Sequence, residues 1–189
     1  INSYEKISFI CNDAGAANII ISWIKKKKLH NFSFFFNGPA KEIAKIEIPT
    51  IKQDKSLIKC IKKSEIIITG SGWMSNLEHQ AIKLSNSLNK KTISVVDHWI
   101  NYKDRFIRDN ELVLPDEIWV TDKYAYKYAS KIFTNTKIRL KKNTYLKELV
   151  CKVKIKEKNF QKNRSESNYL YVAEPMRTNW GKRNQGEFQ

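Results

Sequence analysis

The stretch 64–99, SEIIITGSGWMSNLEHQAIKLSNSLNKKTISVVDHW, decides the fold. Its first part, EIIITG (65–70), is a short apolar run of the kind that forms a fully buried strand. From Leu77, apolar residues recur at i, i+4, i+7 and i+11, which predicts a helix over 75–89. TISVVD (92–97) is again strand-like. Strand, helix and strand in this order predict a βα unit of a parallel sheet.

The same alternation continues on both sides of this stretch. Further strands are predicted at 6–11, 31–38, 117–122 and 137–140. Further helices are predicted at 14–28, 40–46, 55–64, 124–133 and 144–157. The pattern predicts an α/β fold in which a Rossmann-like parallel sheet lies between helices in three αβα layers.

The domain is predicted to span 1–157. The polar stretch 158–167 reads as a linker, because it lacks apolar periodicity. The tail 168–189 contains one more strand-like run, YLYVAEP (169–175). A lone strand cannot bury itself, so it either joins the main sheet or begins a second domain.

The formal charge of +16 has two interpretations. Lysines at 25–28, 62–63 and 90–91 stand before predicted strands, where helix C-termini favour cations. The excess of Lys (29 against six Arg), Ile (24) and Asn (17) also matches A+T-rich codons. The alternative is an anionic partner such as a membrane surface, which would make a peripheral contact. Specific nucleic-acid binding is not expected.

Cysteine and histidine usage argues against a disulfide framework and a metal site. Cys11, Cys60 and Cys151 are odd in number, widely spaced and show no C-x-x-C pair. His30 reads as a loop residue and His79 as a helix-surface residue. Apolar runs are too short for a membrane span and the start has no signal-peptide pattern, so a cytoplasmic protein is expected.

The first candidate loop is Asn12-Asp13-Ala14-Gly15-Ala16-Ala17, which turns the strand at 6–11 into its helix. In parallel sheets the ligand crevice lies outside the carboxyl ends of the strands. Small residues such as Gly15 let the backbone approach a ligand, with Asn12 beside it. Asp13 has two interpretations: an N-cap of the helix, or a general base.

The second candidate loop is Thr69-Gly70-Ser71-Gly72-Trp73-Met74-Ser75. Its two glycines and two hydroxyls could cradle an anion or a sugar hydroxyl, although a tight strand-to-helix turn requires the same glycines. Trp73 could stack on a sugar or base, or cover the sheet edge. The Ser75-Asn76-Leu77-Glu78 pattern that follows predicts a capping box.

The third candidate loop, DHWINYKDRF (97–106), concentrates charged and aromatic residues after a buried strand. His98 can transfer protons near neutral pH, so we expect it to be catalytic. Asn101 and Arg105 are candidate substrate-binding residues, as is Glu174 at the end of the tail strand. No G-x-G-x-x-G, Walker or G-x-S-x-G motif is present, so no cofactor is expected.

The stretch 64–106, followed by LPDEIWVTDKYAYKYASK (114–131), resembles the N-terminal half of GT-B type glycosyltransferases and of the related non-hydrolysing nucleotide-sugar epimerases. The resemblance covers residues 6–133 and takes YLYVAEP as the first strand of a second domain. It rests on the order and spacing of the elements and on the loop after 92–97.

This resemblance implies an acceptor-binding domain of a glycosyltransferase-like enzyme of polysaccharide or glycan biosynthesis. It places Asp13 where such enzymes often have a catalytic base, and His98 in a loop that faces the interdomain cleft. The expected partners are a sugar acceptor or nucleotide sugar, and a C-terminal partner domain or second subunit. The nucleotide-sugar half is missing, so transfer by this chain alone is not expected. The alternative is a non-catalytic Rossmann-like module that binds an anionic partner or small ligand.

Overall fold

The computed structural model describes residues 6–159 of the 189-residue chain. The main sheet contains β1 (Ile7–Cys11), β2 (Phe32–Phe36), β3 (Ile66–Thr69), β4 (Lys91–Val95), β7 (Glu117–Val120) and β8 (Lys137–Leu140). The helices are α1 (Ala14–Lys27), α2 (Gly38–Glu47), α3 (Leu57–Lys62), α4 (Leu77–Ser87), α5 (Lys123–Ile132) and α6 (Thr144–Asn159). A 3-10 turn (Asp104–Phe106) precedes a small hairpin of β5 (Ile107–Arg108) and β6 (Glu111–Leu112). The predicted α/β class is confirmed.

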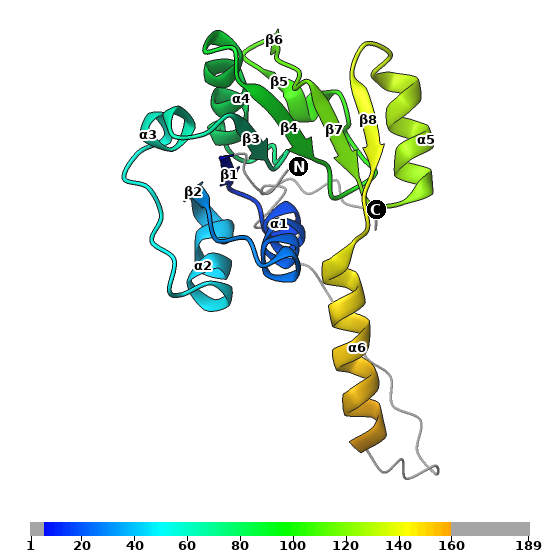
Figure 1. Ribbon diagram of the computed structural model, residues 1–189. Helices are drawn as coiled ribbons and strands as arrows, with labels where there is room; N and C mark the ends of the chain where they lie inside the picture. The colour runs from blue at the N-terminus through cyan, green and yellow to red at the C-terminus, as the bar shows by residue number, and fades with distance from the viewer. Residues whose placement is uncertain (1–5, 160–189) are drawn as a thin grey trace, which may run out of the picture. The chain divides into compact units, whose positions relative to one another are not determined.

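The main sheet has the order β2-β1-β3-β4-β7-β8, and every neighbouring pair is parallel (Figure 1). After β1 the chain adds β2 on one side, and it then returns to add β3 on the other side. The order therefore reverses between β1 and β3. In doubly wound sheets, ligands bind at such a switch point, outside the carboxyl ends of the strands.

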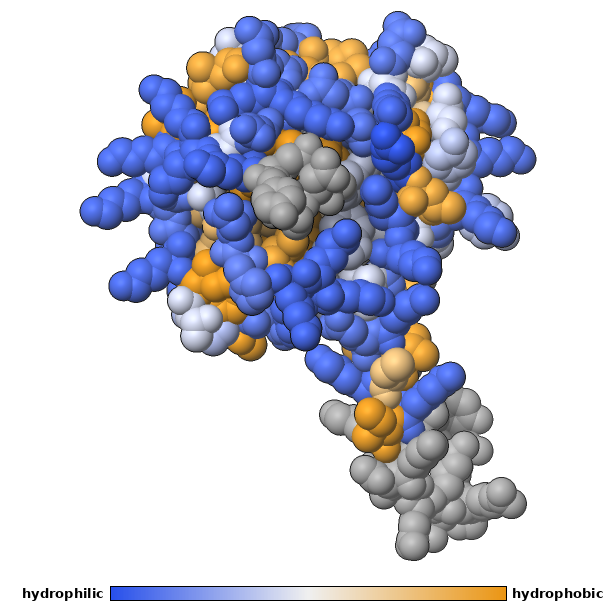
Figure 2. Space-filling view, viewed as in Figure 1, coloured by the Kyte–Doolittle hydropathy of each residue, from blue (hydrophilic) through white to orange (hydrophobic). Residues whose placement is uncertain are grey.

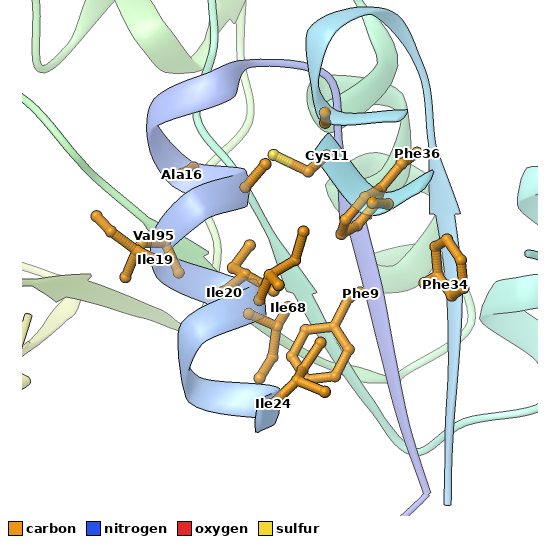
Figure 3. Packing of buried hydrophobic residues seen from close by; sticks show 14 of the residues in the cluster. Phe9, Cys11, Ala16, Ile19, Ile20, Ile24, Phe34, Phe36, Ile68 and Val95 are labelled. Atoms are coloured by element: carbon orange, nitrogen blue, oxygen red, sulfur yellow. The ribbon is translucent and has the colours of Figure 1, made fainter. Parts of the chain in front are cut away.

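Helices cover both faces of the sheet, which confirms the predicted three layers. On one face, α1 and α2 pack on β1, β2 and β3, and Figure 3 shows Ile20 and Ile24 of α1 beside Phe9 and Ile68. On the other face, α3 and α4 pack on Ile10 and Ile67, while α5 covers the β7 side. Because both faces are buried, the central strands carry buried residues on both faces, and the small polar residues among them, Ser8, Thr69, Thr92 and Ser94, are buried as well.

The lysine clusters follow the helix-end prediction in part. Lys25, Lys26 and Lys27 form the last turn of α1, and Lys28 ends it in the left-handed conformation. Lys62 likewise lies in the last turn of α3. The pair at 90–91 lies beyond α4, so the prediction is wrong there. Hydrophilic side chains cover most of the face shown in Figure 2.

Some local predictions are wrong. Helix α4 ends at Ser87 instead of residue 89, and Leu88, which the helical pattern includes, is 37% exposed. Helix α3 has only six residues, fewer than the predicted range 55–64. His79, expected on the helix surface, is buried and its Nε2 lies 3.2 Å from the Glu111 carbonyl oxygen.

The compact unit that contains the sheet ends at Lys152, and α6 continues to Asn159. Residues 158 and 159 of the predicted linker are thus helical. The rest of the linker, the tail 168–189 and Glu174 lie outside the described residues. Among residues 6–159, no helix is both long enough and apolar enough to span a membrane.

Candidate functional site

The three candidate loops follow β1, β3 and β4, which are adjacent in the sheet. Their registers pair Ile10 with Thr69, and Thr69 with Ser94. Because the strands are parallel, all three loops leave the same edge, at the switch point between β1 and β3. The fold therefore brings together loops that are far apart in the chain: the first begins at Asn12 and the third at Asp97.

Asp13 is the N-cap of α1, as one of its two interpretations predicts. Its Oδ1 accepts a hydrogen bond from the Ala16 N–H at 3.0 Å. Its Oδ2 lies 4.0 Å from Cys11 Sγ and is not needed for the cap. Burial raises the pKa of Asp13, and the nearby Asp97 carboxylate raises it further. A half-buried carboxyl with a raised pKa and one spare oxygen can also act as a base.

The glycines of these loops are required for close packing, not for turn conformation. None of Gly15, Gly70 and Gly72 has a positive φ. A Cβ on Gly70 would lie 2.7 Å from Cys11 Sγ, and one on Gly72 would lie 3.0 Å from the Asp13 Cβ. A Cβ on Gly15 would lie 1.7 Å from an oxygen of Asp97. The missing side chains let the loops close around the Asp13 and Asp97 carboxylates.

Arg105 holds the second and third loops together. Its Nη1 donates to Asp97 Oδ1 at 3.1 Å and to the Ser71 carbonyl oxygen at 3.2 Å. Its Nε donates to the Ile100 carbonyl oxygen at 3.0 Å. The Ser71 hydroxyl is itself buried and donates to the Val95 carbonyl oxygen at 2.9 Å. Arg105 and Ser71, which were predicted to bind substrate, therefore form hydrogen bonds within the protein that shape the site.

Sequence reasoning missed Arg108, which supports the second loop from the hairpin. Its Nη2 donates to the Gly72 carbonyl oxygen at 2.8 Å and to that of Ser75 at 3.4 Å. Arg108 follows the 3-10 turn at Asp104–Phe106 by two residues, and no local pattern distinguishes it from a surface arginine. Only the pairing of β5 with β6 places it beside the second loop.

Glu78 was predicted to close a capping box on α4, and this is wrong. The Ser75 hydroxyl instead accepts from the Leu77 N–H at 3.0 Å, and Asn76 is the N-cap without a side-chain bond. The Glu78 side chain turns inward, where its Oε1 accepts from the Asn12 N–H at 2.6 Å. The buried Oε2 of Glu78 has no hydrogen-bond partner among the described residues. Burial is the main cause that raises the pKa of Glu78 to about 7.

One donor atom each of Cys11, Asp13 and Glu78 lies within 4.8 Å of the other two. A thiolate and two carboxylates are a donor set that a divalent cation can use. Without a cation, burial and the neighbouring carboxylates keep the pKa of the Cys11 thiol well above its usual range. The sequence did not predict this cluster, because Glu78 is far from Cys11 and Asp13 in the chain. The absence of a metal site stays a prediction.

The remaining predicted residues lie at the rim or behind the loops. His98 is exposed, and its ring packs beside Trp99 with centroids 6.1 Å apart. Asn101 has a φ of 56° and its carbonyl oxygen accepts from the Arg105 N–H at 3.0 Å. The Asn12 side chain faces Gly38, at the start of α2. Neither His98 nor Asn101 forms a hydrogen bond with Asp13 among the described residues.

Exposed apolar side chains surround this edge of the sheet. Trp73 is 44% exposed and Met74 is 82% exposed. In the third loop, Trp99 is 59% exposed and Ile100 is 50% exposed. The Trp99 Nε1 donates to Asp122 Oδ2 at 2.8 Å, which fixes its ring. Trp73 is partly exposed, and both of its interpretations, stacking on a ligand and covering the sheet edge, stay predictions. Rings in this position offer a stacking surface.

Comparison of the chain with protein-family models, curated proteins and solved structures gives no significant match. The class of the protein rests on its own structure. It is a Rossmann-like α/β protein with a glycine-lined acidic site at the switch point of its sheet.

Proposed function

We propose that this chain is the acceptor-binding domain of a glycosyltransferase-like enzyme of polysaccharide or glycan biosynthesis, and that Asp13 is its catalytic base. The observation that carries the proposal is the spare Asp13 oxygen, which faces two glycines at the switch point. The raised pKa of Asp13 suits a base that takes a proton from a sugar hydroxyl at neutral pH.

The surroundings of Asp13 support a sugar-type ligand. The indoles of Trp73 and Trp99 belong to the second and third loops and are exposed, and sugars bind to such rings through their apolar faces. His98 lies beside Trp99 and contacts the acceptor from the rim. Ser71, Gly72 and Arg105 shape the floor of the site. The partners are a sugar acceptor or nucleotide sugar.

The test is ligand binding by the full chain. Ligand-observed NMR and calorimetry would use methyl hexosides, N-acetylhexosamines and UDP-, GDP- and CMP-sugars at pH 8. Asp13→Asn keeps the cap oxygen but removes the charge, so we expect affinity to fall about tenfold, the value of a charge-assisted hydrogen bond to a hydroxyl. Trp73→Ala should also weaken binding.

Glu42→Gln is the matched control, because Glu42 is an exposed carboxylate on α2 outside the three loops. Its affinity should equal that of the wild type. The proposal fails if none of these sugars binds, or if Asp13→Asn and Glu42→Gln bind equally well.

A further inference from the structure

A second site lies on the α1 face of the sheet. A cavity of about 460 Å³ opens there, within the range of about 300–1,000 Å³ that is typical of small-molecule sites. Its walls are apolar, whereas four lysines line its edge. The lining residues are Phe9, Trp23, Lys26, Lys27, Leu29, Ile68, Trp119, Lys141, Lys142 and Thr144. None of them belongs to the three loops, so the cavity is independent of the proposed function.

The two tryptophans give the cavity its apolar character. Their rings meet edge to face, with centroids 5.6 Å apart. The Trp23 Nε1 donates to the Lys142 carbonyl oxygen at 2.9 Å, and the Trp119 Nε1 donates to Glu117 Oε2 at 3.1 Å. Because both indole N–H groups are bonded within the protein, the rings present only carbon to an occupant. Leu29 and Phe9 add further apolar surface.

The lysines come from two segments that meet across the cavity. Lys26 and Lys27 end α1, and Lys141 and Lys142 connect β8 to α6. Lys141 Nζ lies 4.2 Å from the centroid of the Trp119 ring. Within residues 6–159, none of these four ammonium groups forms an ion pair with a carboxylate. Four uncompensated cations around an apolar cavity attract an anion that carries an apolar group.

We propose that this cavity binds an anionic amphiphile, namely a phosphate ester with an apolar chain. The chain enters between Trp23 and Trp119, and the phosphate stays at the edge with Lys141 and Lys142. Lys141 and Lys142 would thus bind an anionic ligand, a role different from that of lysines at helix C-termini. The phosphate ester is either dissolved or the headgroup end of a membrane lipid.

The experiment measures binding of dodecyl phosphate to the full chain by tryptophan fluorescence and calorimetry, below its micelle concentration. Dodecyl maltoside has the same chain without charge, and inorganic phosphate has the charge without the chain. We expect dodecyl phosphate to bind at least tenfold more tightly than either. Equal affinity for dodecyl phosphate and dodecyl maltoside overturns the proposal.

Two variants locate the site. Lys141→Gln/Lys142→Gln should weaken dodecyl phosphate about tenfold and leave dodecyl maltoside unchanged. Leu29→Trp fills the cavity and should weaken both detergents. The matched control is Lys59→Gln/Lys62→Gln on α3, which removes two exposed charges from the other face of the sheet. An equal loss in this control, or no loss in the first variant, overturns the proposal.

Vesicles identify the source of the phosphate. Phosphatidylcholine vesicles with about 30% phosphatidic acid are compared with pure phosphatidylcholine vesicles. Binding to the anionic vesicles that Lys141→Gln/Lys142→Gln weakens supports the site with a membrane lipid as its occupant. Binding confined to dissolved dodecyl phosphate supports the site with a soluble ester. No response to either source overturns it.

Discussion

Two buried glutamates in this protein have opposite surroundings. Glu78 is 2% exposed and Glu117 is 5% exposed, so both lie in the interior. The pKa of Glu78 is raised to about 7, whereas that of Glu117 is lowered to about 2. Burial is the main cause that raises the pKa of Glu78, whereas hydrogen bonds from three partners outweigh the effect of burial on Glu117.

Glu117 stands at the start of β7, beside cations from both neighbouring strands. Arg139 Nε lies 2.8 Å from its Oε2 and Lys91 Nζ 3.2 Å from its Oε1, and the Trp119 Nε1 also donates to it. Burial alone would raise the pKa of Glu117, but these three bonds outweigh it. This carboxylate joins three strands and stabilises the sheet.

Glu78, in contrast to Glu117, has no cationic partner among the described residues. The Asp13 carboxyl, which lies within 4.8 Å of the Glu78 carboxyl, raises the pKa of Glu78 further. Its backbone partner Asn12 lowers the pKa less than burial raises it. An uncompensated acidic cluster costs stability, and such clusters are more common at functional sites than elsewhere. The comparison therefore favours the switch point as the candidate functional edge.

The largest expected effect is on Glu78. Between pH 4.5 and 7 the folded protein keeps the Glu78 proton that the unfolded chain has released, so the free energy of unfolding falls as pH rises through this window. Glu78→Gln removes this loss and should be more stable than the wild type at pH 8 by about 2–3 kcal/mol. Urea unfolding at pH 5 and pH 8 measures it. A difference between variant and wild type that is the same at both pH values contradicts the interpretation.

Glu117 should respond in the opposite direction. Its pKa is lowered, so its stabilisation is complete above pH 4.5 and is lost as pH falls toward 2. Glu117→Gln should destabilise the protein by about 1–2 kcal/mol at pH 7, because charge-assisted bonds to Arg139 and Lys91 become neutral ones. Thermal unfolding from pH 7 to pH 3 checks both statements. A variant as stable as the wild type at pH 7 would show that the cations add nothing.

The smallest expected effect separates buried from exposed ion pairs. Lys91→Gln removes one exposed partner of the buried Glu117 and should cost about 0.5 kcal/mol. Lys83→Gln removes the partner of Glu111, which is exposed, and should cause no measurable change. Both are measured by urea unfolding at pH 7. If the two variants lose equal stability, burial of the carboxylate is not what distinguishes these pairs.

Much of the fold could be predicted from local patterns. The strands at 65–70 and 92–97 are rich in β-branched apolar residues because helices cover both faces, and these runs are visible in the sequence. The capping box was not predictable in the same way. Ser75 and Glu78 have the spacing of a capping box, but the Glu78 carboxylate instead accepts a hydrogen bond from the N–H of the half-buried Asn12.

The sequence by itself determined the α/β class, the alternation of elements and the three loops, because strand and helix periodicities are local properties of the chain. It also indicated Asp13 as a cap, which depends only on the four residues that follow. Only the tertiary structure decided that Arg105 and Ser71 support the site, that Cys11 and Glu78 join Asp13, and that lysines surround an apolar cavity. Those arrangements depend on strand order, which brings distant residues together and has no local signature.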